Sequence, residues 1–145
     1  MLTAEQLKTL ESVHREVYNS FTYVPDSVKW KTPEYWASVQ DIILMEQEGK
    51  YSGDCDDFAL AVRYHLRKHN IPNQLLLCWV HAAAGYHLEV YSHGYISECN
   101  HPFVMTLDDL NQENIMLSGF EKGEPWHYVK PFTAITIWPH LRGTL

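Results

Sequence analysis

The stretch YSGDCDDFAL, residues 51–60, places one cysteine among three aspartates at the predicted start of a helix. The aspartates should raise the pKa of the Cys55 thiol, because nearby negative charge disfavours a thiolate. The unpaired N–H groups and the dipole at a helix N-terminus act in the opposite direction. Cys55 is therefore either a small buried side chain or a nucleophile that depends on a base from another part of the chain.

His87 is the candidate for that base. It stands at the predicted start of a strand and follows AAAGY, a run of small residues that lets another element approach closely. A cysteine and a histidine in hydrogen-bond contact can carry out acyl transfer, in which the imidazole takes the thiol proton and the sulfur attacks a carbonyl. The pair Cys55 and His87 therefore predicts a cysteine-dependent acyl-transfer site.

A third residue is needed to orient the histidine, and the next strand offers two candidates. A two-residue turn at 93–94 would join the strand that begins at His87 to a second strand at 95–99. In that register Glu98 and Asn100 lie on the face toward which His87 points, because residues two apart on a strand share a face. Either side chain could accept the imidazole N–H, and the charged Glu98 would also stabilise an imidazolium.

The other two cysteines are predicted to take no part in this chemistry. Cys78 lies in the apolar run LLLCWV and is expected in the core, and the side chain of Cys99 is expected to face away from His87. A slip of one residue in the hairpin would instead turn Cys99 toward His87. Three cysteines without a CxxC pair indicate neither a disulfide framework nor a cysteine-rich zinc site.

Two helices are predicted before the cysteine. Thr3 and Gln6 form a capping-box pattern ahead of an apolar stripe, which indicates a first helix. The dipeptide at 32–33, Thr-Pro, is predicted to open a second helix that runs to Met45.

The third predicted helix positions the thiol. It begins near Asp54 and ends at Asn70, just before a proline. Cys55 stands at the tip of the apolar face of this helix, which is formed by Phe58, Ala59, Val62 and Leu66. The thiol is therefore expected where the helix meets the sheet.

Strand-like segments follow the helices along the chain. They are 74–81, 87–92, 95–99 and 133–139, with a short helical turn predicted at 107–112. Helices that precede antiparallel strands predict an α+β fold with a helical layer over one sheet.

Composition limits the alternatives. The 145 residues predict a single domain over 1–145, and 46% hydrophobic and 20% charged residues are typical of a globular protein. A net charge of −7 argues against nucleic acid as the partner, and no apolar run is long enough to predict a membrane span. The oligomeric state is left open by these observations.

The motifs GDCDDFAL, GYHLEV and GYISECNHP, in this order, resemble those of the bacterial transglutaminase-like cysteine peptidases, a branch of the papain-like superfamily. The upstream run VHREVYNSFTYVPDSVKWKTPEYWASVQDII and the segment PWHYVKPF are also similar, so the resemblance covers nearly the whole chain. It implies a papain/transglutaminase-like α+β fold in which N-terminal helices pack on an antiparallel sheet.

By this resemblance Cys55 corresponds to the nucleophile, His87 to the base, and Glu98 to an acidic position where the family usually carries aspartate. The implied function is that of a peptidase that hydrolyses an amide bond in a protein or peptide. Two alternatives stay open: an amine-transferring transglutaminase, and a degenerate module that binds a peptide or protein without catalysis. The acidic, amphipathic N-terminal segment does not resemble a signal peptide, so we expect a cytoplasmic protein of bacterial or phage origin.

The resemblance also raises the question of calcium. Some family members resemble this chain at the acidic residues flanking the cysteine and bind calcium through them, which nominates Asp54 and Asp56 as ligands. Carboxylate oxygens suit this ion. Helix capping by Asp54, with Asp56 and Asp57 in the first turn, would explain the same residues without a metal. We expect no required cofactor, and calcium is the single candidate.

Overall fold

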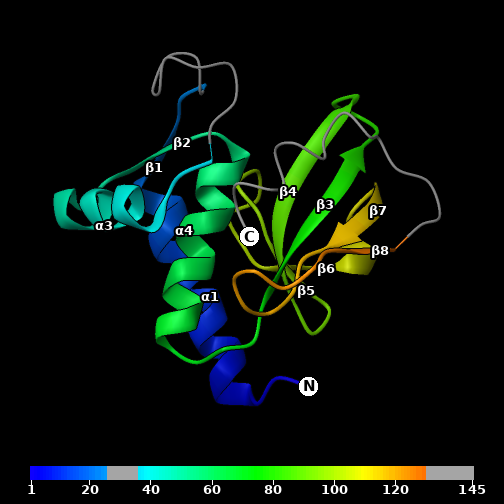
Figure 1. Ribbon diagram of the computed structural model, residues 1–145, viewed down its shortest axis with the longest axis horizontal. Coiled ribbons are helices and arrows are strands. Elements are labelled where there is room, and N and C mark those ends of the chain that lie inside the picture. The colour runs from blue at the N-terminus through cyan, green and yellow to red at the C-terminus, as the bar shows by residue number, and fades with distance from the viewer. Residues whose placement is uncertain (26–35, 130–145) are drawn as a thin grey trace.

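The computed structural model describes residues 1–25 and 36–129, and it places a layer of helices beside a sheet (Figure 1). The helices are α1 (Ala4–Ser20), α3 (Val39–Glu48) and α4 (Cys55–Lys68), with a 3-10 turn at Leu107–Asp109. The strands are β1 (Phe21–Tyr23), β2 (Tyr51–Gly53), β3 (Gln74–Val80), β4 (Gly85–Ser92), β5 (Tyr95–Ser97), β6 (Met105–Thr106), β7 (Gln112–Leu117) and β8 (His127–Tyr128). The predicted α+β architecture is confirmed.

The larger sheet is antiparallel throughout and has the strand order β6-β5-β4-β3-β7-β8, while β1 and β2 form a separate parallel pair. Strand β4 pairs with β3 from Gly85 to Tyr91, but β5 pairs only with Val90–Ser92. The first half of β4, which includes His87, therefore extends beyond the end of β5. This leaves room on that side of His87 for side chains from other elements.

The hairpin between β4 and β5 has the predicted turn. His93 and Gly94 have φ angles of 48° and 93°, both in the left-handed region that a two-residue hairpin turn of this kind requires. Ser92 pairs with Tyr95, as the register predicted. The turn therefore brings the end of β5 back toward the start of β4.

Helix α4 supplies the core. The residues of its inward face are fully buried: Phe58, Ala59, Val62 and Leu66. They pack in one hydrophobic cluster with Leu88 and Val90 of β4, and α1 contributes to the same cluster. The predicted capping box of α1 is also present, since Thr3 and Gln6 exchange hydrogen bonds of 2.9 and 3.1 Å. None of the described helices is both long and apolar enough to cross a bilayer.

Some predicted elements differ from the structure or lie outside the described residues. Helix α3 begins at Val39 with Ser38 as N-cap, where Ser38 and Asp41 form a capping box. Residues 36–38, which were predicted to be helical, are therefore not part of the helix, and the predicted start at 32–33 and the predicted strand 133–139 lie outside the described residues. Strand β7 was not predicted, because its sequence does not alternate between polar and apolar residues. Only its Ile115 and Met116 are buried.

Candidate active site

The candidate active site begins at the junction of β2 and α4. Gly53 has a φ of 146°, and a Cβ there would lie 2.0 Å from Asp57 Oδ2, so only glycine fits. The Asp54 backbone N–H donates to Asp57 Oδ2 at 3.0 Å, and Asp54 Oδ1 accepts from the Asp56 backbone N–H at 3.2 Å. This N-cap fixes Cys55 as the first residue of α4.

The Cys55 thiol lies between the tip of α4 and strand β4. Burial raises its pKa well above the usual value and Asp56 raises it further, while a hydrogen bond with the Leu88 backbone opposes them. Cys55 Sγ donates a hydrogen bond to Asp56 Oδ1 at 3.4 Å, so in this structure the thiol proton points to Asp56 and not to His87. The resting cysteine is therefore a neutral thiol, which needs a base before it can attack. Leu88 directly follows His87, so the thiol stands beside the strand that carries the candidate base.

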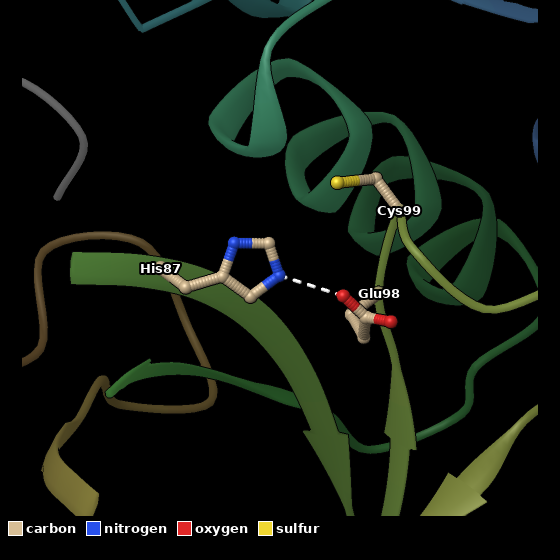
Figure 2. A group of neighbouring side chains, drawn as sticks. All are labelled: His87, Glu98 and Cys99. Atoms are coloured by element: carbon tan, nitrogen blue, oxygen red, sulfur yellow. Dashed lines mark hydrogen bonds and ion pairs between the residues drawn. The ribbon is translucent and has the colours of Figure 1, made fainter. Parts of the chain in front are cut away.

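His87 and Glu98 form a buried hydrogen-bonded pair (Figure 2). Their atoms Nε2 and Oε2 are 2.7 Å apart, and the two side chains are 10% and 2% exposed. Burial raises the pKa of Glu98, but hydrogen bonds from His87 and His101 lower it, and the net pKa lies below the ordinary value. Glu98 is therefore an ionised carboxylate at neutral pH.

The charge of Glu98 decides which tautomer His87 adopts. An ionised carboxylate can only accept hydrogen bonds, so Nε2 of the neutral ring carries the proton and Nδ1 carries the lone pair. Nδ1 makes no hydrogen bond within the part of the chain that the structure describes. His87 thus presents an unoccupied basic nitrogen, as a general base requires.

A buried histidine of α1 holds the segment that carries Glu98. His14 Nε2 donates to the His101 backbone oxygen at 2.8 Å, and His14 Nδ1 accepts from the Ser97 hydroxyl at 2.6 Å. His101 Nδ1 in turn donates to Glu98 Oε1. Each oxygen of the Glu98 carboxylate therefore accepts a hydrogen bond from one histidine, His87 or His101. Sequence reasoning missed both contacts of His14, because they join residues that lie far apart in the chain.

Glu89 is a second buried carboxyl group beside His87, and sequence reasoning missed it too. It is 1% exposed, its Oε2 lies 3.9 Å from His87 Nε2, and its Oε1 accepts from Gln112 at 2.8 Å. Burial raises the pKa of Glu89 to about 7, although the Gln112 hydrogen bond and His87 lower it. Glu89 is thus partly protonated at neutral pH, whereas Glu98 is ionised. The available signal was its position two residues from His87, which puts both on one strand face.

Cys99 does not face away from His87, so that expectation is wrong. Strand β5 ends at Ser97, and the alternation of faces therefore stops before Cys99. Its sulfur and one ligand atom each of His87 and Glu98 all lie within 4.8 Å of one another. Burial raises the pKa of Cys99 to about 12, and the charge of Glu98 contributes. The site thus contains a second neutral thiol.

The remaining candidates occupy other positions. Asn100 is exposed, and its side-chain oxygen lies 3.9 Å from Cys99 Sγ, so the structure brings Glu98 rather than Asn100 to the His87 ring. Asp54 caps α4 and the Asp56 side chain accepts from the Cys55 thiol. The predicted role of these two aspartates in calcium binding stays a prediction.

A cysteine at the tip of a helix, beside a strand that carries a carboxylate-bound histidine, has the three groups that a Cys–His–acid triad requires. The chain belongs to the bacterial transglutaminase-like cysteine proteinase family (BTLCP), whose profile matches residues 1–92. It is therefore a cysteine peptidase of the transglutaminase-like type. The matched range includes Cys55 and His87 but ends before Glu98, so the choice of the acidic residue depends on the geometry above.

Solved structures of LapG from Legionella pneumophila share the fold. One is 16% identical with a TM-score of 0.68, and the match covers 86% of this chain and 70% of that chain. An EGTA-treated LapG structure is 16% identical with a TM-score of 0.67, and the match covers 94% of this chain and 77% of that chain. A calcium-bound LapG structure is 14% identical with a TM-score of 0.63, and the match covers 96% of this chain and 84% of that chain. A comparison with curated protein sequences gave no match. At these identities the likeness to LapG concerns the fold alone.

Proposed function

We propose that this peptidase hydrolyses amide bonds in a protein or peptide substrate through Cys55, His87 and Glu98. The Cys55 proton passes to His87 Nδ1 and the sulfur attacks the substrate carbonyl. The imidazolium then gives its proton to the leaving amine, which leaves an acyl-enzyme. A water molecule deprotonated by His87 releases the acid product and restores the thiol. Membership in a family of proteinases favours water over an amine as the acceptor.

The observation that carries this proposal is the buried His87–Glu98 hydrogen bond of 2.7 Å. Burying a carboxylate costs on the order of several kcal/mol unless its partners offset that cost. A module that only bound a peptide would gain nothing from an ionised group behind a histidine. A peptidase gains a fixed tautomer and a stabilised imidazolium.

The start of α4 would also stabilise the oxyanion that forms on the substrate. The first N–H groups of a helix lack intrahelical partners, and the backbone N–H of Cys55 is among them. In the proposed mechanism this group donates to the developing oxyanion.

The test measures whether His87 activates Cys55. In His87→Ala, alkylation of Cys55 by iodoacetamide near neutral pH should be slower by at least about tenfold, because the base is missing. Peptide mapping by mass spectrometry separates Cys55 from Cys78 and Cys99. The matched control is His81→Ala, which removes an exposed histidine between β3 and β4 and should leave the rate unchanged. Equal rates in wild type and His87→Ala would contradict the proposal.

Calcium binding at Asp54 and Asp56 is a second, separate part of the proposal. The calcium-bound and EGTA-treated LapG structures support it by analogy of fold. The fit to this chain is partial, because one oxygen of Asp54 already caps α4 and one of Asp56 accepts from the Cys55 thiol. Carboxylate oxygens can serve several partners at once, so these bonds do not prevent coordination.

If calcium binds there, millimolar calcium should raise the melting temperature and EGTA should reverse the rise, because a ligand of the folded state stabilises it. Asp54→Asn and Asp56→Asn should each reduce that shift, whereas Asp108→Asn, at an exposed turn, should not. Isothermal titration calorimetry without any heat of binding would leave helix capping as the whole role of these carboxylates.

A further inference from the structure

Among residues 1–25 and 36–129, three side chains form a group that could hold a metal ion: His87, Glu98 and Cys99. Each offers one ligand atom, and these atoms lie within 4.8 Å of one another. Figure 2 shows the Cys99 sulfur pointing toward the His87 ring, while the Glu98 carboxylate meets the same ring from the end of β5. His87 and Glu98 are buried, and Cys99 is partly exposed, so an ion can enter from the side of Cys99.

The chemistry of this group selects the ion. Nitrogen, sulfur and carboxylate oxygen are the three ligand types of tetrahedral zinc, whereas calcium takes six to eight oxygens. Zinc–ligand distances of about 2.0–2.3 Å place tetrahedral ligand atoms roughly 3.3–3.8 Å apart. The widest separation in the group must therefore contract by about 1 Å, which rotation of the partly exposed Cys99 side chain can supply. The hydrogen-bonded atoms His87 Nε2 and Glu98 Oε2, which are 2.7 Å apart, must instead move apart to admit the ion between them. Three protein ligands leave a fourth position open for water, whereas structural zinc sites have four protein ligands.

We propose that His87, Glu98 and Cys99 bind zinc and that the bound ion reversibly inhibits the peptidase. The inhibition, though not the binding, rests on the function proposed for His87. Zinc displaces the Cys99 thiol proton to solvent and binds the thiolate. Zinc takes the lone pair of one nitrogen of the neutral His87 ring: if that nitrogen is Nδ1 the ring proton stays on Nε2, and if it is Nε2 the ring proton moves to Nδ1. No basic nitrogen then remains to accept the Cys55 proton.

Cobalt(II) is the probe for the binding step, because a thiolate ligand produces a sulfur-to-cobalt charge-transfer absorption. The experiment uses the Cys55→Ser protein, so that binding is measured without peptidase activity. One equivalent of cobalt should produce the band, zinc should abolish it by displacement, and millimolar calcium should not. Adding Cys99→Ser should remove the band and weaken zinc binding by at least about tenfold. Adding Cys78→Ala instead, which removes a thiol of β3, should leave the charge-transfer band and the zinc affinity unchanged.

The inhibition step is measured on the protein that retains Cys55. Zinc should slow iodoacetamide alkylation of Cys55 by at least about tenfold, and a chelator should restore the rate. In Cys99→Ser the same zinc concentration should have a much smaller effect. Circular dichroism and the melting temperature establish that this variant is folded.

Either of two results would overturn the zinc site: no charge-transfer band in Cys55→Ser, or a band that persists in Cys55→Ser/Cys99→Ser. The outcome is separable from that of the proposed function. If cobalt and zinc bind as described but alkylation of Cys55 is independent of His87, the metal site stands and the catalytic role of His87 fails.

Discussion

Cys55→Ala is expected to abolish peptidase activity, with a loss of about four orders of magnitude or more in kcat. The covalent acyl-enzyme cannot form without the thiol, and what remains is only the rate due to binding and oxyanion stabilisation. The fold should survive, because Asp54, Gly53 and Asp57 form the helix start without the thiol. Hydrolysis of a fluorogenic peptide library, together with the melting temperature, measures both effects.

Two variants make this result specific. Cys78→Ala removes another buried thiol and should retain activity as long as the protein is folded. Cys55→Ser keeps the size of the side chain but replaces the thiol by a much weaker acid, so it should be inactive as well. A clean Cys55→Ala preparation that still cleaves peptides would end the cysteine mechanism.

Glu98→Gln is expected to lower kcat by about 10²-fold or more. The Glu98 carboxylate accepts from His87 on one oxygen and from His101 on the other. A glutamine amide has one oxygen, so one of the two histidine N–H groups must lose its acceptor. If the amide NH₂ turns toward His87, it donates to Nε2 and moves the ring proton to Nδ1, which is the wrong tautomer for a base. The imidazolium also loses its negative partner.

Kinetics can separate this role from a structural one. A change in orientation and charge at His87 should lower kcat and alter the pH profile with little effect on KM. Asn100→Ala, at the exposed position two residues on, should retain most activity. If Asn100→Ala is the crippling change and Glu98→Gln is silent, the site is Cys–His–Asn and the acid is misassigned. Glu98→Asp, which restores the residue usual in the family, tests the importance of side-chain length.

Features governed by short stretches of chain could be predicted from sequence. The caps at Thr3 and Asp54 and the turn at 93–94 each depend on residues within a few positions of one another. Cys55 could be placed at the tip of α4 because the apolar period of that helix marks its buried face. The approach of Glu98 to His87 followed from the turn and from the resemblance together.

What could not be predicted depends on where strands end and on contacts between distant elements. The prediction that the Cys99 side chain faces away from His87 was wrong, because side chains alternate between the two faces only inside a strand. Strand β5 ends at Ser97, two residues before Cys99. The contacts of His14 with Ser97 and His101 join residues that are 83 and 87 positions apart in the sequence, and no local pattern reveals them. The raised pKa of Glu89 arises from burial, which is a property of the folded molecule.

His14 also gives the protein a built-in limit of acid tolerance. Burial lowers its pKa below 6.5, although the His101 backbone hydrogen bond raises it. The folded state therefore favours the neutral ring, and the stability that His14 contributes is complete above pH 6.5 and declines as the pH falls below that value. A proton on Nδ1 would remove the lone pair that accepts the Ser97 hydroxyl, and so release the tie between α1 and the end of β5. Acid inactivation should therefore begin with detachment of the Glu98 segment, while the apolar packing of α4 on the sheet still holds.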